Sequence, residues 1–290
     1  MRLELSGSLV RPDPIVLKFN ANSTFDTQKY IDLGYTHFDV ICIGGAGGMG
    51  GGIDTNNTGT QVRNWGGAGG GGGFHRVRGL LSALPVSCLV VVGAGGIKGN
   101  DHASDPAQTT NGVDGGASTF NASTCRASGG KGGSRARSNS LTVTTQANGG
   151  DGGIGNRTTA GGGGIGGTAG TPSATGPGTP GTAGADGTFF TNIGKGGGGG
   201  AGGVGKYGGV TCNAATSGGR GSYNPGDTSV YGPGDAPDND PVSGATSVKP
   251  GGASGAKAAP LNGLPTVYGQ SKNDSIYGDA GTVILRLTAE

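Results

Sequence analysis

The chain has 290 residues, including 71 glycines and 14 prolines, and its 20 lysines and arginines nearly balance 18 aspartates and glutamates, for a net charge of +2. That balance excludes the basic footprint of a nucleic-acid-binding domain, so we expect no nucleic-acid partner. No apolar stretch approaches the roughly 20 residues of a membrane-spanning helix, and the N-terminus lacks the apolar core of a secretory signal. We therefore expect neither a membrane span nor a signal peptide.

Strand-like segments lie towards the two ends of the chain. They are short runs with period-two alternation or β-branched enrichment, at 2–5, 15–19, 36–43, 74–81, 86–92 and 281–290. In the run 36–43, Phe38, Val40 and Cys42 alternate with Asp39, Ile41 and Ile43. The closing strand, 281–290, must return to a sheet that begins near the N-terminus.

The first glycine run follows the strand at 36–43 and reads VICIGGAGGMGGG over 40–52. Gly45, Gly47 and Gly50 fit the pattern of a dinucleotide-binding turn, which also needs a helix after the last glycine and an acidic residue about 20 residues on. The chain continues with more glycine and no helical period, and position 70 is glycine. These residues exclude a dinucleotide site, and we expect no cofactor.

The glycine runs repeat every three residues, and most triplets hold two glycines, as in 44–52 and 196–210. Three residues per turn is the period of a polyproline II-type helix, which has no internal hydrogen bonds. With two bare faces, such helices can pack closely and bond laterally through their backbones. In 196–210 the triplets predict one row of side chains: Ala201, Val204, Tyr207 and Val210.

A glycine array needs a side-chain core beside it. Ordering a glycine costs about 1–2 kcal/mol of backbone entropy, whereas a net hydrogen bond contributes about 0.5–1.5 kcal/mol. The sequence therefore predicts an all-β fold with very little α-helix: a small antiparallel β-sandwich that holds an inserted, packed array of glycine-rich helices and long loops.

Cysteines and histidines give no catalytic or metal-binding spacing. The cysteines, Cys42, Cys88, Cys125 and Cys212, are predicted to be free thiols, with a Cys125–Cys212 loop disulfide as the alternative. No histidine has a carboxylate and serine at catalytic spacing. His37 and His75 stand beside strand starts and are interpreted as sheet-rim side chains. We expect no enzymatic activity.

The remaining candidates lie in loops or beside glycine runs. Asp235, Asp238 and Asp240 could bind calcium but lack the ligand spacing of an EF-hand, so a solvated turn is favoured. Aromatic side chains are candidates for contact with a receptor or partner; the four selected are Trp65, Tyr207, Tyr223 and Tyr231. For Trp65 and Tyr207, packing over bare glycine helices is an equal alternative.

The order of these segments resembles the glycine-rich domain of phage tail proteins, especially minor tail proteins of actinobacterial siphophages. Three stretches carry the resemblance, which covers roughly residues 20–290: FDVICIGGAGGMGGG, GGAGGGGGFHRVRGLLSALPVSCLVVVGAGG and GTVILRL. The design is also similar to the fibre-tip adhesin of T-even-like phages and to the glycine-rich module of the anaplastic lymphoma kinase family. The missing signal peptide and kinase argue against the last.

The resemblance implies a structural component of a virion tail tip, made in the host cytoplasm, with loops that recognise the host surface. The alternative is a purely architectural tail protein that contacts only other virion subunits. The expected partners are other tail proteins, a host-envelope glycan or protein, and further copies of the chain, with a trimer favoured. Residues 1–35 would form an N-terminal strand segment for attachment, and 36–290 the glycine-rich domain, with its array over 93–280.

Overall fold

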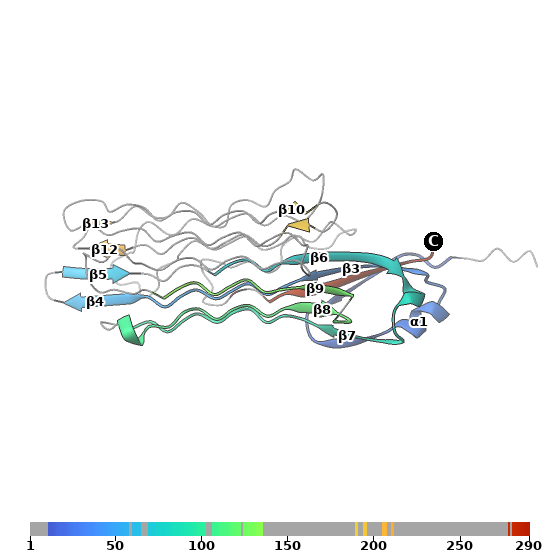
Figure 1. The fold of residues 1–290 in the computed structure, drawn as a ribbon, viewed down its shortest axis with the longest axis horizontal. Coiled ribbons are helices and arrows are strands. Elements are labelled where there is room, and N and C mark those ends of the chain that lie inside the picture. The colour runs from blue at the N-terminus through green and yellow to red at the C-terminus, as the bar shows by residue number, and fades with distance from the viewer. Residues whose placement is uncertain are drawn as a thin grey trace, which may run out of the picture.

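A computed structural model of the chain describes residues 11–57, 60–64, 69–102, 106–122, 124–135, 189–190, 194–195, 205–207, 210–211, 278 and 280–290. Two antiparallel four-stranded sheets pack face to face at one end of an elongated molecule, and the glycine-rich segments run from them towards the other end (Figure 1). The predicted all-β class, with little α-helix, is confirmed.

The first sheet has the order β1-β14-β3-β6, and we call it the first sheet throughout. Its strands are β1 (Ile15–Phe19), β14 (Thr282–Thr288), β3 (His37–Ile43) and β6 (Phe74–Leu80). Strand β14 pairs with β3 along its whole length, from Thr282 opposite Ile43 to Thr288 opposite His37. The predicted return of the C-terminal strand to the core sheet is therefore confirmed, and β14 lies inside the sheet rather than at its edge.

The second sheet has the order β2-β7-β8-β9. Its strands are β2 (Ser23–Asp26), β7 (Ser87–Val91), β8 (Ser118–Phe120) and β9 (Cys125–Ala127). Only β7 was predicted. Strands β8 and β9 have three residues each, too few for a period-two pattern, and they interrupt the stretch 93–280 that was expected to be glycine array.

Short helices complete the sandwich end and the loops. Helix α1 (Thr27–Asp32) begins where the Asp26 carboxylate accepts the Lys29 N–H at 3.1 Å, a side-chain N-cap. Two 3-10 turns are also present. The turn η1 (Leu81–Ala83) follows β6, and η2 (Pro106–Gln108) lies between β7 and β8 in the sequence. With β1 and β2, α1 places much of the predicted N-terminal segment 1–35 in the same sandwich as the strands that follow it.

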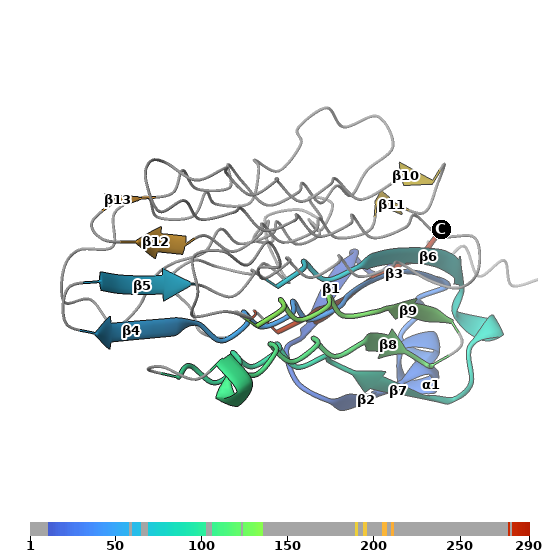
Figure 2. The same ribbon diagram turned by 60° about the vertical axis from the view of Figure 1, so that its left-hand side comes forward.

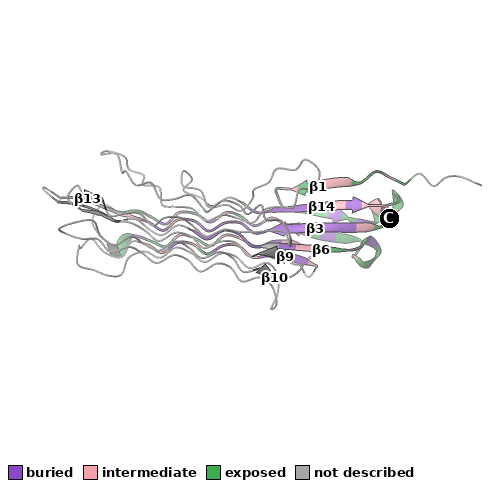
Figure 3. Ribbon diagram, turned by 90° about the horizontal axis from the view of Figure 1, so that it is seen from above, coloured by how far each residue is buried: buried purple, intermediate pink, exposed green. Residues whose placement is uncertain are grey.

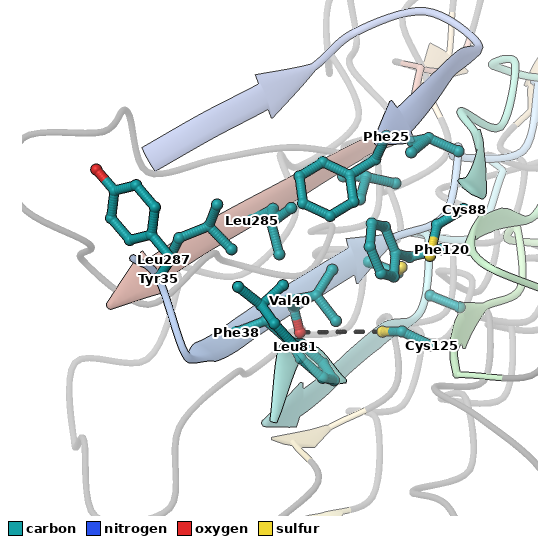
Figure 4. Packing of buried hydrophobic residues seen from close by; sticks show 14 residues of the cluster. Phe25, Tyr35, Phe38, Val40, Leu81, Cys88, Phe120, Cys125, Leu285 and Leu287 are labelled. Carbon is teal, nitrogen blue, oxygen red and sulfur yellow. Dashed lines mark hydrogen bonds between the residues drawn. The ribbon is translucent and has the colours of Figure 1, made fainter. Parts of the chain in front are cut away.

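The side-chain core lies between the two sheets (Figure 4). Phe120 of the second sheet packs against Phe25 and Phe38, with ring centroids 5.7 and 6.4 Å apart. Val40 and Leu285 face the same layer and are fully buried. Each such side chain contributes about 1.5–3 kcal/mol through burial, and this layer is the side-chain core that the glycine array was predicted to need.

The opposite face of β3 is also buried over part of its length. Ile41, Ile43 and Ile284 have no exposed surface, although they do not belong to the layer between the sheets. The short strand β11 (Gly194–Lys195), which pairs with β10 (Phe189–Phe190), lies against β6 at the edge of this sheet. The alternation of 36–43 was therefore predicted correctly, but both of its faces carry apolar packing.

A third four-stranded sheet forms at the far end of the molecule, with the order β13-β12-β5-β4 (Figure 2). Its strands are β4 (Ile53–Asn57), β5 (Thr60–Asn64), β12 (Gly205–Tyr207) and β13 (Val210–Thr211). The prediction of one continuous glycine helix over 196–210 is wrong at 205–207 and 210, which are in strands. Tyr207 pairs with Val210, and the two glycines between them in sequence are the signal of a two-residue hairpin turn.

Candidate functional site

The glycine-rich segments are organised around residues 44–52, which we call the central segment. It exchanges backbone hydrogen bonds with four outer segments: 69–73, 93–102, 109–116 and 128–135. The partners in 69–73 and 109–116 run antiparallel to it, and those in 93–102 and 128–135 run parallel. The outer segments also form backbone hydrogen bonds with one another. Among the described residues, these four segments surround the central segment.

These bonds recur every third residue, as a helix with three residues per turn requires. The N–H groups of Gly45, Gly48 and Gly51 donate to carbonyls of 109–116, each at 2.9 Å. The N–H groups of Gly96 and Gly99 in turn donate to carbonyls of the central segment, each at 2.7 Å. The backbone groups that a polyproline II-type helix leaves open are thereby satisfied laterally.

Glycine is required on two of the three faces of the central segment. A Cβ on Gly47 would lie well within 3.0 Å of the Lys131 backbone carbonyl, and one on Gly48 equally close to that of Ile97, nearer than real Cβ atoms approach. The third positions carry Ala46, which is fully buried, and Met49. In the described segments, the glycine-rich helices therefore pack through two faces without side chains, as predicted.

Exposed side chains stand in rows on the outer segments. Along 93–102 every third residue is exposed: Ala94, Ile97 and Asn100. The Val113 N–H donates to the Ile97 carbonyl at 2.8 Å, and these two apolar residues are 53% and 54% exposed. The inside of the array thus consists mainly of glycine backbone, and its side chains stand on the outside. These outer rows of side chains are one surface to which a ligand or subunit can bind.

A polar row lies where 109–116 meets 128–135. Lys131 Nζ lies 2.6 Å from Asp114 Oδ2, and the Gly132 N–H donates to Asp114 Oδ1 at 2.9 Å. Burial disfavours the charged form of Asp114, but the hydrogen bonds from Lys131 and Gly132 outweigh it, and the pKa of Asp114 is lowered. The carboxylate fastens one outer segment to the next.

Side chains also close the far end of the central segment. The Asp101 carboxylate accepts the Gly52 N–H at 2.7 Å and forms an ion pair with Lys98. Arg135 donates to the carbonyls of Ala107 and Thr109, at 3.1 and 2.8 Å. These contacts fasten Asp101 to the end of the central segment, and residues 107 and 109 to the end of 128–135.

One predicted contact residue belongs to the far-end sheet. Tyr207 lies in β12, opposite Val62 of β5, whereas Trp65, which follows β5 in sequence, lies outside the described residues. Five further predicted site residues also lie outside the described part of the chain: Tyr223, Tyr231, Asp235, Asp238 and Asp240. The aromatic candidates and the weak calcium candidates therefore remain predictions.

The histidines occupy different environments. His37 lies at the start of β3, with Nδ1 2.9 Å from Thr36 Oγ1, as expected for the rim of a sheet. His75 is not at the rim: it is 4% exposed and faces the layer between the sheets, where Nδ1 accepts the Arg126 N–H at 3.1 Å. The sequence places His75 at a strand start, but that start is not a sheet edge, because β9 packs over it.

Three cysteines are free thiols buried in the sandwich: Cys42, Cys88 and Cys125. Cys125 donates to the His75 carbonyl at 3.3 Å, and burial beside Cys42 raises the pKa of its thiol well above the usual range. The alternative loop disulfide to Cys212 is therefore wrong for this structure. Within the described ranges, no group of three histidine, cysteine or acidic side chains could hold a metal ion.

One charged cluster is not predicted from the sequence. Asp39 of β3 lies between Arg76 and Arg78 of β6, on the face of the first sheet that points away from the second. The signal was present in the sequence, because Asp39, Arg76 and Arg78 stand in phase with each other in two alternating runs. Neither run contains all three residues, and only the pairing of β3 with β6 brings them together.

No protein-family model matches the chain, and neither does any curated protein. Among the described helices, none has the length and apolar character to cross a membrane.

Proposed function

We propose that the chain is a structural component of a phage tail tip that exposes loops for recognition of the host surface. The observation that supports this proposal is the division of the molecule into a side-chain-packed sandwich, a glycine-packed stem and a separate sheet at the far end (Figures 1 and 2). A stem of this kind holds one end of a protein at a distance from the other.

The central segment of the array offers little for recognition, because most of its positions carry no side chain. Strand side chains that face the layer between the two sheets are taken up by packing. Recognition residues are typically found on loops that a rigid scaffold positions. Loop 222–250, with Tyr223 and Tyr231, remains the best candidate, because tyrosine offers apolar and hydrogen-bonding surface at low entropic cost.

The test is a phage that carries Tyr223→Ala and Tyr231→Ala. We expect particles to assemble normally and to adsorb less to host cells. A matched control carries Tyr268→Ala and Tyr277→Ala, two tyrosines outside this loop, and should adsorb normally. Equal adsorption by both phages would refute recognition through the loop.

A second function, as a purely architectural tail protein, is favoured by the exposed apolar residues at the sandwich end. Leu33, Leu80 and Val86 are 56%, 51% and 65% exposed, and they would offer apolar area to a neighbouring subunit. The phage that carries Tyr223→Ala and Tyr231→Ala also tests this function. If it yields few assembled particles, and those particles adsorb to host cells normally, the loop is a subunit contact. In either function we propose a non-enzymatic homo-oligomer, with a trimer favoured, whose mass light scattering can measure.

A further inference from the structure

Two cysteine side chains from different sheets meet in the layer between the sheets. Cys42 belongs to β3 and Cys125 to β9, and both are fully buried. Strand β9 lies against β3 and β6. Cys125 Sγ lies 3.3 Å from the His75 carbonyl oxygen and 4.0 Å from that of Val40 (Figure 4). His75 is the register partner of Cys42, and Val40 stands two residues before Cys42, so both contacts place Cys125 Sγ beside Cys42.

These two thiols contact each other and not the third buried cysteine. Cys42 and Cys125 form a side-chain hydrogen bond. Cys88 instead lies 3.6 Å from Thr27 Oγ1 and 3.6 Å from the Pro85 carbonyl, in β7, which β8 separates from β9. A disulfide needs two sulfur atoms that approach each other from facing backbones. In the part of the chain that the structure describes, Cys42 and Cys125 meet this condition.

The cysteine pair lies where the sandwich becomes the glycine array. Cys42 stands two residues before the central segment, and Cys125 stands three residues before the outer segment 128–135. Just beyond the cysteines, the Gly130 N–H donates to the Gly45 carbonyl at 2.9 Å. Figure 3 shows that the burial of β3 continues into the array. A covalent bond between the cysteines would therefore fasten two glycine-rich segments together at the point where both leave the sandwich.

We propose that Cys42 and Cys125 form a disulfide when the protein meets a small organic disulfide such as oxidised glutathione, and that this bond fastens the glycine array to the sandwich. The structure shows the reduced form, in which both thiols are free. The cysteine pair is separate from loop 222–250, on which the proposed function depends, so either idea can fail without the other.

The reaction is a thiol–disulfide exchange in two steps. Cys125 loses a proton to solvent, and its thiolate attacks one sulfur of oxidised glutathione, so that the glutathione S–S bond breaks and one glutathione thiolate leaves. The Cys42 thiolate then attacks the Cys125 sulfur of the mixed disulfide and expels the second glutathione thiolate. The protein loses two electrons and two protons, and oxidised glutathione is reduced to two thiols.

Access to the cysteine pair depends on β9. Burial raises the pKa of the Cys125 thiol well above its usual range, so the closed sandwich holds little thiolate. Strand β9 has three residues and lies at the edge of the second sheet. Local opening of a short edge strand costs less free energy than global unfolding and exposes Cys125 to the oxidant. Oxidation is therefore slow in the folded protein, and the disulfide, once formed, holds β9 closed.

The test compares the full chain after incubation with oxidised glutathione and after incubation with dithiothreitol. In the oxidised chain, we expect peptide mapping by mass spectrometry to find Cys42 linked to Cys125. The midpoint of thermal unfolding should rise by about 5–15 °C, because the bond closes a long loop of the unfolded chain. Hydrogen exchange in 44–52 and 128–135 should slow, since both segments begin next to the bond.

The matched control is C88A, which removes a buried thiol of the same layer and should keep both the linked peptide and the rise in the midpoint. C42A and C125A should each lose both. Three results would overturn the proposal: all four cysteines still reacting with N-ethylmaleimide after oxidation and denaturation, a link from Cys125 to Cys212, or a midpoint that does not rise in the linked chain. Each is measured on the wild type, so the proposal stays falsifiable if C42A or C125A fails to fold.

Discussion

The sandwich and the glycine array hold the same chain together by opposite means. In the sandwich, large side chains such as Phe120 and Leu285 exclude water, and the backbone is paired within sheets. In the array, Gly47 and Gly48 exclude side chains, so that backbones approach each other and bond directly. A core residue stabilises the fold by burying its apolar side chain, whereas a glycine of the array stabilises it by having no Cβ, which lets two backbones come close enough to form hydrogen bonds.

This difference has an energetic consequence. Apolar burial gives roughly 25 cal/mol per Å² and needs no exact orientation, whereas a net backbone hydrogen bond gives only about 1 kcal/mol against the high ordering cost of glycine. The array therefore depends on the sandwich to fix its segments in register, and the sandwich depends little on the array. The predictions below test this asymmetry, from the largest expected effect to the smallest.

Deletion of residues 281–290 should abolish folding of the whole described structure. The ten residues include β14, which pairs with β1 on one side and β3 on the other. Hydrogen exchange should show protection lost in the array as well as in the sandwich. A chain that ends after Thr288 is the control and should keep its protection. Persistent array protection in the longer deletion would show that the glycine segments are stable without a core.

Leu285→Ala should destabilise the protein by about 2–5 kcal/mol, because Leu285 is fully buried in the layer between the sheets. The matched control is Leu89→Ala. Leu89 is a strand leucine that is 58% exposed, and its loss should change stability by no more than about 0.5 kcal/mol. Denaturant unfolding of both variants measures the difference, and equal effects would contradict the position of the core.

Gly48→Ala should destabilise the protein by about 1–3 kcal/mol or more, because its Cβ would overlap the Ile97 backbone carbonyl, which has no room to move. The control is Val113→Ala, on the residue whose carbonyl accepts the Gly48 N–H. Val113 is 53% exposed, so its change should have almost no effect. A larger loss of stability from Val113→Ala than from Gly48→Ala would show that Val113 faces the inside of the array and Gly48 the outside.

Asp114→Asn should weaken the array slightly and only when the carboxylate is ionised. The folded pKa of Asp114 is lowered, so its contribution is fully present above the unfolded pKa of about 3.9 and is lost as the pH falls through the folded value. Because the Asp114–Lys131 pair is half exposed, we expect less than about 1 kcal/mol at neutral pH. Unfolding at pH 7 and pH 3 measures it.

The control for this last variant is Lys131→Met, which removes the other partner. The two single changes should cost similar amounts, and the double variant should cost little more than either. Additive losses would mean that the ion pair does not connect the two outer segments.

The sequence predicted most reliably where one pattern determined one structure. Alternation in 36–43 and 281–290 identified strands of the first sheet, because β-branched residues at period two fit few other structures. The triplet pattern of 44–52 predicted a backbone-packed segment for the same reason. Strands β8 and β9 could not be found, because three residues carry no period and their pairing is fixed only by the sheet around them.

The remaining errors came from patterns that fit two structures. The two glycines after Tyr207 continue a triplet repeat and also form a hairpin signal, and pairing with β5 decides in favour of the hairpin. His75 stands at a strand start, but the packing of β9 against β6 places it inside. The cluster around Asp39 arises from the pairing of β3 with β6. Arg76 and Arg78 lie 37 and 39 residues after Asp39 in the sequence, so no local window contains all three.

Because the backbone hydrogen bonds of the central segment recur every third residue, its length can change only by whole triplets. Adding one residue to 44–52 would turn Ala46 or Met49 onto a face where backbone oxygens leave no space for a Cβ. Adding a whole triplet would restore the faces and extend the stem by about 9 Å, provided that each outer segment gains its own triplet. The reach of such a protein would therefore evolve in coordinated increments of one turn, while the loops beyond the last turn can change length freely.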